Sequence, residues 1–376
     1  MKNRALQTRR LAHLLAGVSV LLWLALCATP VALSQEGRLV RESVHGVSLE
    51  KNMTKESPNR RVSVYLPPSY DKEPGKRYPV VYLLHGITDT DGTWVNSWGV
   101  PGNEGWATIP EVMNNGIAAR RFGEMIIVMP DELTNWGGSF YTNSPVTGNW
   151  EDFTVKDLVS YIDGKYRTLD RASSRGIAGH SMGGYGAIKL GMKHPDVYSV
   201  VYGLNPAVLG WGRDLTIENP AFAYVLSNNV KTPDEALKGG LYSLAVIVVA
   251  QAFSPNPARP PLYADFPVAL VGGKLRPSEP AFSKWQENFP TNMVEKYQSN
   301  LSKLRGLRFD SGYEDEFTHI PPTARALSSV LTAHGIEHTF EEYNGDHRNR
   351  LWGRTGRLAT EVLPYFWLLL DSEPQR

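Results

Sequence analysis

Short apolar runs recur along the chain between residues 60 and 343, and their patterns predict strands. Residues 80–84 and 125–129 are apolar almost throughout, which is typical of strands buried on both faces. At 61–66 apolar and polar residues alternate, as in a half-buried strand. We predict strands at 61–66, 79–84, 125–129, 175–178, 197–204, 307–310 and 338–343. The polar residues 35–60 precede them as an irregular lead-in or a first edge strand.

Segments with helical spacing lie between these strands. They cover 152–162, 185–192 and 323–334, and the last ends before Gly335, which suits a helix C-cap. This alternation of strands and helices predicts an α/β fold with a mostly parallel central sheet and helices on both of its faces.

Residues 205–306 interrupt this alternation. They contain several prolines, an apolar run at 241–250 and a polar helical stretch that reaches Lys303. We interpret them as an insertion at the edge or the active-site face of one domain that spans 35–376.

The first 34 residues have the three parts of a secretory signal peptide. Basic residues come first, residues 11–26 are apolar, and Ala-Leu-Ser at 32–34 offers a cleavage site after Ser34. An apolar run of this length is shorter than the roughly 20 residues that span a bilayer. We therefore expect a secreted or periplasmic protein with no stable membrane span. An uncleaved anchor is the main alternative, and we do not expect a lipoprotein anchored through Cys27.

Cleavage would change the charge of the chain. The full sequence has 39 basic and 38 acidic residues, and the signal carries four of the basic ones, so 35 basic against 38 acidic residues remain. This charge balance argues against binding to nucleic acid, which usually needs a basic face. The single cysteine, Cys27, would leave with the signal. We expect no disulfide, no metal site and no cofactor.

Residues 179–184, Gly-His-Ser-Met-Gly-Gly, follow a predicted strand and open a predicted helix. This is the pattern of a nucleophile elbow, a tight turn that lifts a serine hydroxyl clear of the sheet. Glycines flank the serine at positions where a side chain would clash. We predict Ser181 as a nucleophile, with the backbone N–H of Met182 directed at the same space.

A nucleophilic serine needs a base and an acid that orients the base. We predict His347 as the base, because it follows the last strand and so lies at the same edge of the sheet as Ser181. His319, His334 and His338 fit less well by position. We predict Asp315 as the acid, in the loop after the strand at 307–310. The alternatives for the acid are Asp310, Glu314 and Glu316, while Asp346 is rejected because neighbouring side chains usually diverge.

The oxyanion of an acyl-transfer reaction needs two N–H donors. Met182 N–H is one. His85, Gly86 and Ile87 follow the buried strand at 79–84, so Ile87 N–H is the second. We expect a structural role for His85 itself.

Together these residues resemble the esterase D family of α/β-hydrolases, which includes feruloyl and acetylxylan esterases, S-formylglutathione hydrolases and mycolyltransferase antigens. The resemblance covers about residues 60–370 and is carried by segments 82–86, 148–153, 179–184, 312–315 and 346–347. It implies the α/β-hydrolase fold and the same roles for Ser181, Asp315, His347, Ile87 and Met182. The long stretch at 205–306 departs from the compact members.

Aromatic residues are frequent in the loops after the first two buried strands. Such loops rim the active site in this fold, and flat rings can stack on sugars or phenolic acids. We predict Trp94, Trp136 and Tyr141 as substrate-binding residues, from a group that also includes Trp98, Trp106 and Phe140.

These observations predict a serine carboxylic ester hydrolase that acts on a small-molecule or carbohydrate ester, including acylated carbohydrate or phenolic esters. The alternatives are an acyltransferase of the mycolyltransferase type and a catalytically silent binding module. The oligomeric state is left open.

Overall fold

A central sheet of eight strands organises the part of the chain that the structure describes. The structure is a computed structural model, and it describes residues 36–96 and 107–373. Along the sheet the strands follow the order β1-β2-β4-β3-β7-β8-β11-β12. The strands from β4 to β12 pair in parallel, while β2 is antiparallel to both β1 and β4. The strands are β1 (Arg38–His45), β2 (Asn59–Leu66), β3 (Val80–Leu84), β4 (Ile126–Pro130), β7 (Arg175–His180), β8 (Val200–Leu204), β11 (Gly306–Gly312) and β12 (Thr339–Tyr343).

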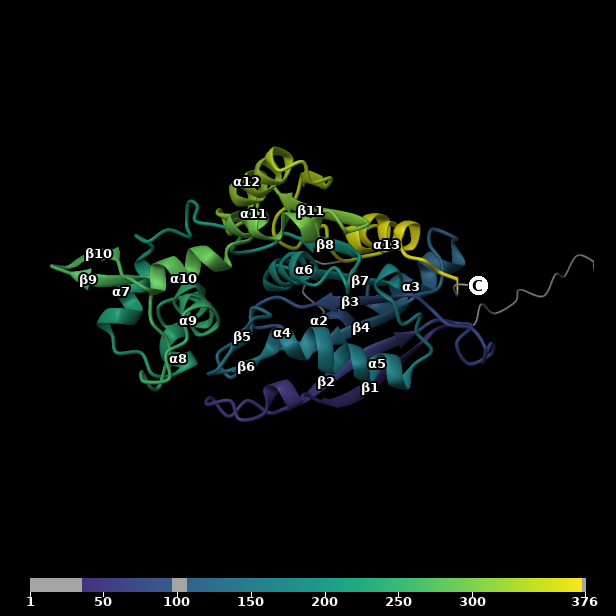
Figure 1. Cartoon of the computed structure of the whole chain (residues 1–376), viewed down its shortest axis with the longest axis horizontal. Coiled ribbons are helices and arrows are strands. Elements are labelled where there is room, and N and C mark those ends of the chain that lie inside the picture. The colour runs from purple at the N-terminus through teal and green to yellow at the C-terminus, as the bar shows by residue number, and fades with distance from the viewer. Residues whose placement is uncertain (1–35, 97–106, 374–376) are drawn as a thin grey trace, which may run out of the picture. The chain divides into compact units, whose positions relative to one another are not determined.

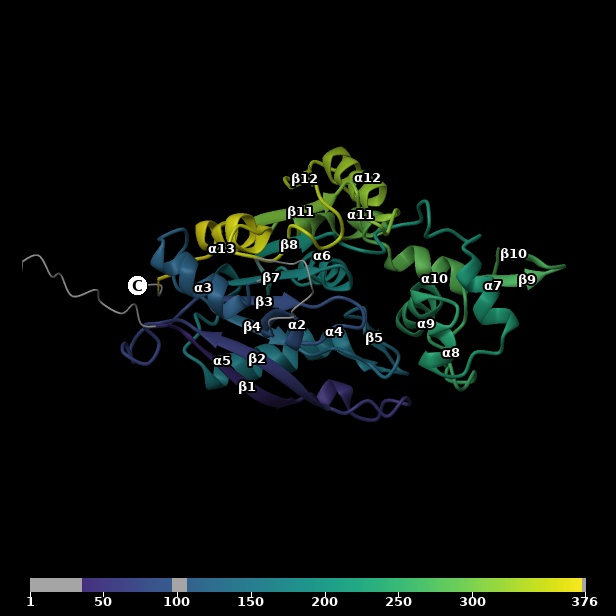
Figure 2. The same ribbon diagram turned by 180° about the vertical axis from the view of Figure 1, so that it is seen from behind.

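Helices cover both faces of this sheet (Figures 1 and 2). The side chains of Val80, Tyr82 and Leu84 belong to one buried cluster, while Val81 and Leu83 belong to another. This division follows from the two-residue repeat of a strand. The first cluster includes residues of α5 (Leu158–Lys165), α6 (Met182–Lys193), α11 (Pro290–Leu301) and α12 (Ile320–Ala333), and the second includes residues of α3 (Ile109–Ala118) and α13 (Leu363–Leu369). The prediction of a mostly parallel sheet between helices is confirmed.

The predicted strands all lie in this sheet, although some of their limits differ. The segment at 197–204 becomes a strand only from Val200, because residues 194–198 turn after α6 with the N–H groups of Val197 and Tyr198 bonded to His194 O. Of the two readings of the lead-in, an edge strand is correct for β1, which pairs with β2 over its whole length. The helix expected at 152–162 consists of α4 (Trp150–Asp152), a π-helical turn at Phe153–Asp157, and α5.

The stretch at 205–306 supplies a group of elements between β8 and β11. It contains α7 (Pro220–Ser227), α8 (Pro233–Leu237), α9 (Leu241–Phe253), the β9–β10 hairpin (Val268–Val271 and Lys274–Pro277), α10 (Ala281–Asn288) and α11. The apolar run at 241–250 is helix α9. Both views in Figures 1 and 2 show α9 and α10 beside the loops that follow β4 and carry β5 (Asn143–Ser144) and β6 (Gly148–Asn149). We call residues 205–306 the insertion from here on.

The described residues, 36–96 and 107–373, belong to one compact unit. Within the described residues no helix is both long and apolar enough to cross a membrane. The predicted signal peptide, Trp98 and Trp106 lie outside the described residues.

Candidate active site

Ser181 stands at a strained turn between strand β7 and helix α6. Its backbone has φ 58° and ψ −116°, which an L-residue adopts only under strain. The turn depends on close backbone contacts. A Cβ on Gly179 would lie 2.3 Å from Gly183 O, and a Cβ on Gly183 would lie 2.2 Å from Leu84 O. Only glycine fits at these two positions, which explains the sequence pattern on either side of the serine.

His347 and Asp315 form a buried pair. His347 Nδ1 lies 2.7 Å from Asp315 Oδ2, and the two side chains are 2% and 0% exposed. The other carboxylate oxygen, Oδ1, accepts from Phe317 N–H at 2.8 Å. Because the carboxylate can only accept when ionised, the proton of a neutral His347 stays on Nδ1, and Nε2 remains an acceptor.

Burial acts on the charge of both partners. It lowers the pKa of His347 and raises the pKa of Asp315, because a dry environment disfavours either ion. The hydrogen bonds from His347 and Phe317 to Asp315 act in the opposite sense by stabilising the carboxylate. At neutral pH the arrangement therefore favours a neutral imidazole.

The peptide carbonyl of His347 is also fixed by hydrogen bonds. His347 O accepts from His180 Nε2 at 2.8 Å and from Asn205 Nδ2 at 3.0 Å. The His180 and His347 rings also pack with their centroids 4.5 Å apart. Since His180 immediately precedes Ser181, these contacts fix the last loop of the chain against the nucleophile elbow.

The alternative acids have other partners. Asp310 is fully buried and accepts from Arg357 Nε at 2.7 Å and from Tyr202 OH at 2.8 Å. Glu316 accepts from the backbone N–H of His347 at 3.2 Å. Asp346 accepts from the N–H groups of Arg348 and Asn349. Of the acids considered from the sequence, Asp315 is the one whose carboxylate bonds the His347 ring.

The loop after β3 approaches Ser181 closely. A Cβ on Gly86 would lie 3.4 Å from Ser181 Cβ. His85 fixes the peptide that joins Gly86 to Ile87, because its Nδ1 lies 2.8 Å from Gly86 O. In a trans peptide the N–H points opposite to the C=O, so the Ile87 N–H is directed away from the buried His85 ring.

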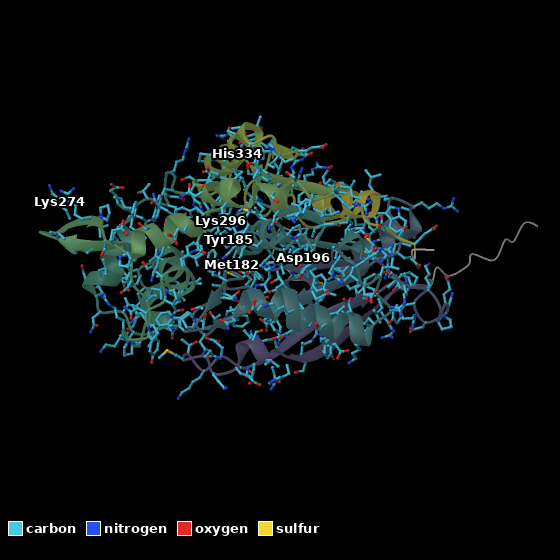
Figure 3. The ribbon with its side chains drawn as sticks, in the orientation of Figure 1. Met182, Tyr185, Asp196, Lys274, Lys296 and His334 are labelled. Atoms are coloured by element: carbon cyan, nitrogen blue, oxygen red, sulfur yellow. The ribbon has the colours of Figure 1, made fainter. Side chains whose placement is uncertain are left out.

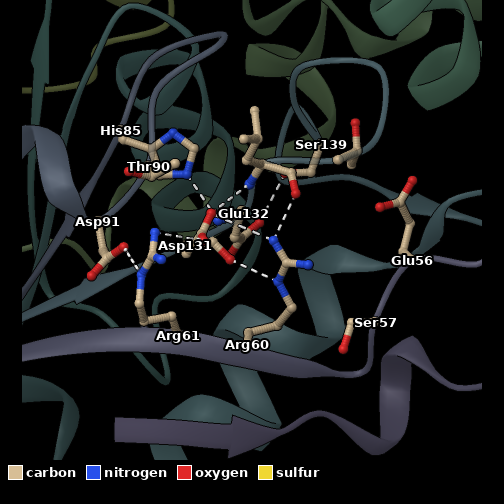
Figure 4. Close-up of polar contacts among 12 residues, drawn as sticks. Glu56, Ser57, Arg60, Arg61, His85, Thr90, Asp91, Asp131, Glu132 and Ser139 are labelled. Atoms are coloured by element: carbon tan, nitrogen blue, oxygen red, sulfur yellow. Dashed lines mark hydrogen bonds and ion pairs between the residues drawn. The ribbon is translucent and has the colours of Figure 1, made fainter. Parts of the chain in front are cut away.

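A polar network holds His85 in turn. Its Nε2 accepts from Glu132 N–H at 2.8 Å, so the ring is neutral with its proton on Nδ1. Figure 4 shows this contact beside the ion pairs of Arg60 and Arg61 with the carboxylates of Asp131 and Asp91. Burial raises the pKa of Glu132 to about 8. The network joins the loops after β3 and β4, so His85 is structural, as expected.

A cavity of about 50 Å³ opens beside Ser181. The nucleophile elbow and the loop after β3 contribute one side, with Ser181, Met182 and Ile87. Helix α9 of the insertion contributes another. Figure 3 labels Met182 and Tyr185 at the end of α6 that faces α9 and α10. The residues that line the cavity are Ile87, Phe140, Ser181, Met182, Ala207, Val208, Leu215, Leu241, Tyr242, Ala245, Val246, Val249, Trp285, Phe317 and His319.

The predicted substrate-binding aromatics do not line this cavity. Trp94 is 1% exposed and stacks on Trp352 in the second buried cluster, because α2 (Gly92–Val95) turns it toward that face of the sheet. Tyr141 is fully buried and donates to His85 O at 2.9 Å. Trp136 is 6% exposed and belongs to the first cluster. Of the aromatics considered from the sequence, Phe140 does line the cavity.

His319, which its position in the sequence disfavoured, contributes to the cavity. Its Nδ1 lies 3.0 Å from Asp214 Oδ1, and Tyr242 OH donates to the other oxygen of the same carboxylate. Burial would raise the pKa of Asp214, but the hydrogen bonds from His319 and Tyr242 outweigh it and lower the pKa to about 2. The cluster ties the insertion to the start of α12. No local sequence signal links these three residues, since they are far apart along the chain.

The described residues include no group of three or more His, Cys, Asp or Glu side chains that could hold a metal ion.

Comparison with known proteins assigns the chain to a family. The family model for the Esterase family matches residues 55–355. The chain belongs to the Esterase family. The match includes Ser181, Asp315 and His347, and the resemblance stated from the sequence is confirmed.

Relatives of this Esterase-family chain are similar over part of their length. Esterase Rv1288 of Mycobacterium tuberculosis is 33% identical over 142 residues, which is 36% of this chain and 26% of the relative. S-formylglutathione hydrolase of Arabidopsis thaliana is 28% identical over 163 residues, 40% of this chain and 54% of the relative. The chain thus spans between a quarter and about half of these curated relatives.

A solved structure of a ferulic acid esterase shares the fold. It superposes with a TM-score of 0.57 at 21% identity and covers 90% of this chain and 100% of the other. The chain therefore has the α/β-hydrolase fold and belongs to the Esterase family.

Proposed function

We propose that this chain is an exported serine esterase that forms an acyl-enzyme on Ser181. His347 Nε2 takes the proton of the Ser181 hydroxyl as the oxygen attacks the ester carbonyl. The backbone N–H groups of Ile87 and Met182 bind the oxyanion, and His347 then protonates the leaving alcohol. Water repeats the sequence on the acyl-enzyme and releases the acid. Asp315 keeps the proton on Nδ1 and stabilises the imidazolium that forms.

The observation that carries this proposal is the buried His347–Asp315 hydrogen bond beside the strained Ser181. Strain at φ 58° costs about 1–3 kcal/mol, and burial of two ionisable groups adds to that cost. Strained residues and buried ionisable pairs of this kind cluster at active sites. The orientation of the Gly86–Ile87 peptide by His85 supports the oxyanion site. Export rests on the pattern of residues 1–34, and the substrate class rests on the cavity beside Ser181.

A fluorophosphonate probe tests the nucleophile directly. The wild-type chain should be labelled at Ser181, and Ser181→Ala should not be. Ser199→Ala is the matched control, since this serine is also buried but directly precedes β8 and bonds Arg175 O at the start of β7, and it should be labelled as the wild type is. Folded wild-type protein that takes no label would contradict the proposal.

Added acceptor alcohol separates hydrolysis from acyl transfer. We expect free acid as the main product at every acceptor concentration below the molar range. An acceptor ester that dominates at millimolar alcohol would instead make the chain an acyltransferase.

A further inference from the structure

The cavity beside Ser181 is almost entirely apolar. Helix α9 turns one face toward it, with Leu241, Ala245 and Val249 spaced four residues apart, as successive turns of a helix require. The adjoining Tyr242 and Val246 widen the same face. All of these residues belong to the insertion, so the insertion sets the chemistry of the cavity.

The polar groups in the lining are already engaged, apart from the nucleophile. Trp285 Nε1 donates to Ser254 Oγ at 3.0 Å. Tyr242 OH and His319 Nδ1 both turn to the Asp214 carboxylate. A polar substituent in this cavity would compete with those bonds or lie unpaired, and a buried unpaired hydroxyl is costly.

The cavity lies on the acyl side of the reacting carbonyl. Among the described residues, its lining includes Ile87 and Met182, which hold the oxyanion in the proposed mechanism, and does not include His347. The alcohol leaves on the side of His347, because that imidazole protonates it. The group that enters the cavity is therefore the acyl chain.

The size of the cavity limits the chain. About 50 Å³ is a small volume, a few times the roughly 10–15 Å³ that one water molecule needs, so the cavity suits a short chain and not a bulky ring. The walls are closely packed, since Val246, Val249 and Trp285 are at most 2% exposed.

From these observations we infer that the cavity is an acyl-binding site for short, saturated, unsubstituted chains, with about two to four carbons beyond the carbonyl, and that α9 of the insertion determines this length. The inference rests on the proposed function and names its substrate class. It assigns esters of aliphatic acids to this site in place of esters of phenolic acids such as ferulic acid.

A series of 4-nitrophenyl esters tests the inference, because the alcohol is constant and only the acyl group varies. Each buried methylene should raise kcat/KM about fourfold. Butanoate should then exceed acetate by about 15-fold, octanoate should fall below butanoate, and ferulate should lie at least about tenfold below butanoate. All rates are divided by the rate of hydroxide hydrolysis of the same ester. A preference for ferulate, or equal rates from acetate to octanoate, would overturn the inference.

Two neighbouring valines of α9 provide a matched pair. Val249→Ala enlarges the cavity and should move the optimum toward hexanoate. Val248→Ala removes the same atoms from the same buried helix, but Val248 does not line the cavity, so its acyl profile should stay that of the wild type. Equal profiles for the two variants would contradict the role of α9.

A filling variant covers the case in which Val249→Ala does not fold. Ala245 is half-buried in the lining, so Ala245→Leu adds atoms toward the cavity. It should lower kcat/KM for butanoate more than for acetate, by at least about fivefold.

The same samples distinguish a failure of the proposed esterase function from a failure of the inferred acyl-binding site. Wild-type protein that neither reacts with a fluorophosphonate nor hydrolyses any ester would remove the proposed function, and the inference with it. Protein that is labelled and hydrolyses esters, but whose acyl preference does not depend on residues 245 and 249, would remove the inference alone.

Discussion

Asp315→Asn is a sharp perturbation, because the two donors approach different oxygens of the carboxylate and an amide has only one oxygen. In the wild type, His347 Nδ1 and Phe317 N–H approach different oxygens of Asp315 at 2.7 and 2.8 Å. The asparagine oxygen can face one of them, and the NH₂ group must face the other. The side chain is fully buried, so water does not replace the missing acceptor.

The two orientations of the amide have different consequences. With the oxygen on Phe317 N–H, the NH₂ group faces His347 Nδ1 and moves the ring proton to Nε2, where it blocks proton transfer from Ser181. The reverse orientation keeps the active tautomer but leaves a buried N–H unpaired, which costs about 1–3 kcal/mol. The active form is then outnumbered by a factor of about 5 to 150.

A second loss comes from the missing negative charge. A charge-assisted hydrogen bond to the imidazolium contributes about 1.5–3 kcal/mol, a further factor of about 10 to 150. Together we expect kcat to fall between about 50-fold and 20,000-fold, with little change in KM. Initial rates on 4-nitrophenyl butanoate measure this, and circular dichroism checks the fold.

The matched control is Asp346→Asn. It makes the same change next to His347, but Asp346 Oδ1 alone accepts from Arg348 and Asn349, and an asparagine oxygen can keep both bonds. Its kcat should stay within about threefold of the wild type. A loss of less than tenfold in folded Asp315→Asn, or an equal loss in both variants, would refute the assignment of Asp315.

Three further variants test other parts of the structure. His85→Ala frees the Gly86–Ile87 peptide, whose N–H is an oxyanion donor in the proposed mechanism, so kcat should fall about 10- to 100-fold with KM nearly constant; a change confined to KM would contradict this positioning role. Asp310→Asn removes one carboxylate from a buried arginine, so the free energy of unfolding should fall by about 3 kcal/mol in urea titrations, whereas an unchanged midpoint would argue against that ion pair. Burial lowers the pKa of Lys189 to about 7, well below its value in the unfolded chain. Between pH 7 and 10 the unfolded chain therefore holds more protons, and the free energy of unfolding of the wild type relative to Lys189→Met should rise with pH, by up to about 1.4 kcal/mol per unit. A flat or falling difference over that range would contradict the effect.

Local pattern was sufficient to predict most of the fold. Residues 80–84 and 126–130 are apolar on both faces because helices cover both sides of the sheet, and a strand of that kind is recognisable without its neighbours. The glycines at 179 and 183 mark the nucleophile elbow because a side chain at either position would meet backbone within 2.4 Å. Such steric requirements act over a few residues, so they are visible in sequence.

The walls of the cavity could not be predicted in the same way. Trp94 and Phe140 both follow buried strands in aromatic-rich segments, yet Trp94 stacks on Trp352 in the second buried cluster and Phe140 lines the cavity beside Ser181. The apolar run at 241–250 shows that a helix or strand is buried, but not what covers it. The contacts among Asp214, Tyr242 and His319 join residues separated by up to 105 positions. No short sequence pattern could predict them.

The central claim is that an acyl group is carried on Ser181, and mass spectrometry of the quenched enzyme tests it most directly. The wild-type chain is mixed with 4-nitrophenyl butanoate and stopped in acid during turnover, and the intact mass and the peptide that contains Ser181 are then measured. The account predicts one added butanoyl group, on Ser181, that disappears as the substrate is consumed and accumulates less in Asp315→Asn. An acyl group on another residue, or turnover that continues at the wild-type rate in Ser181→Ala, would contradict it.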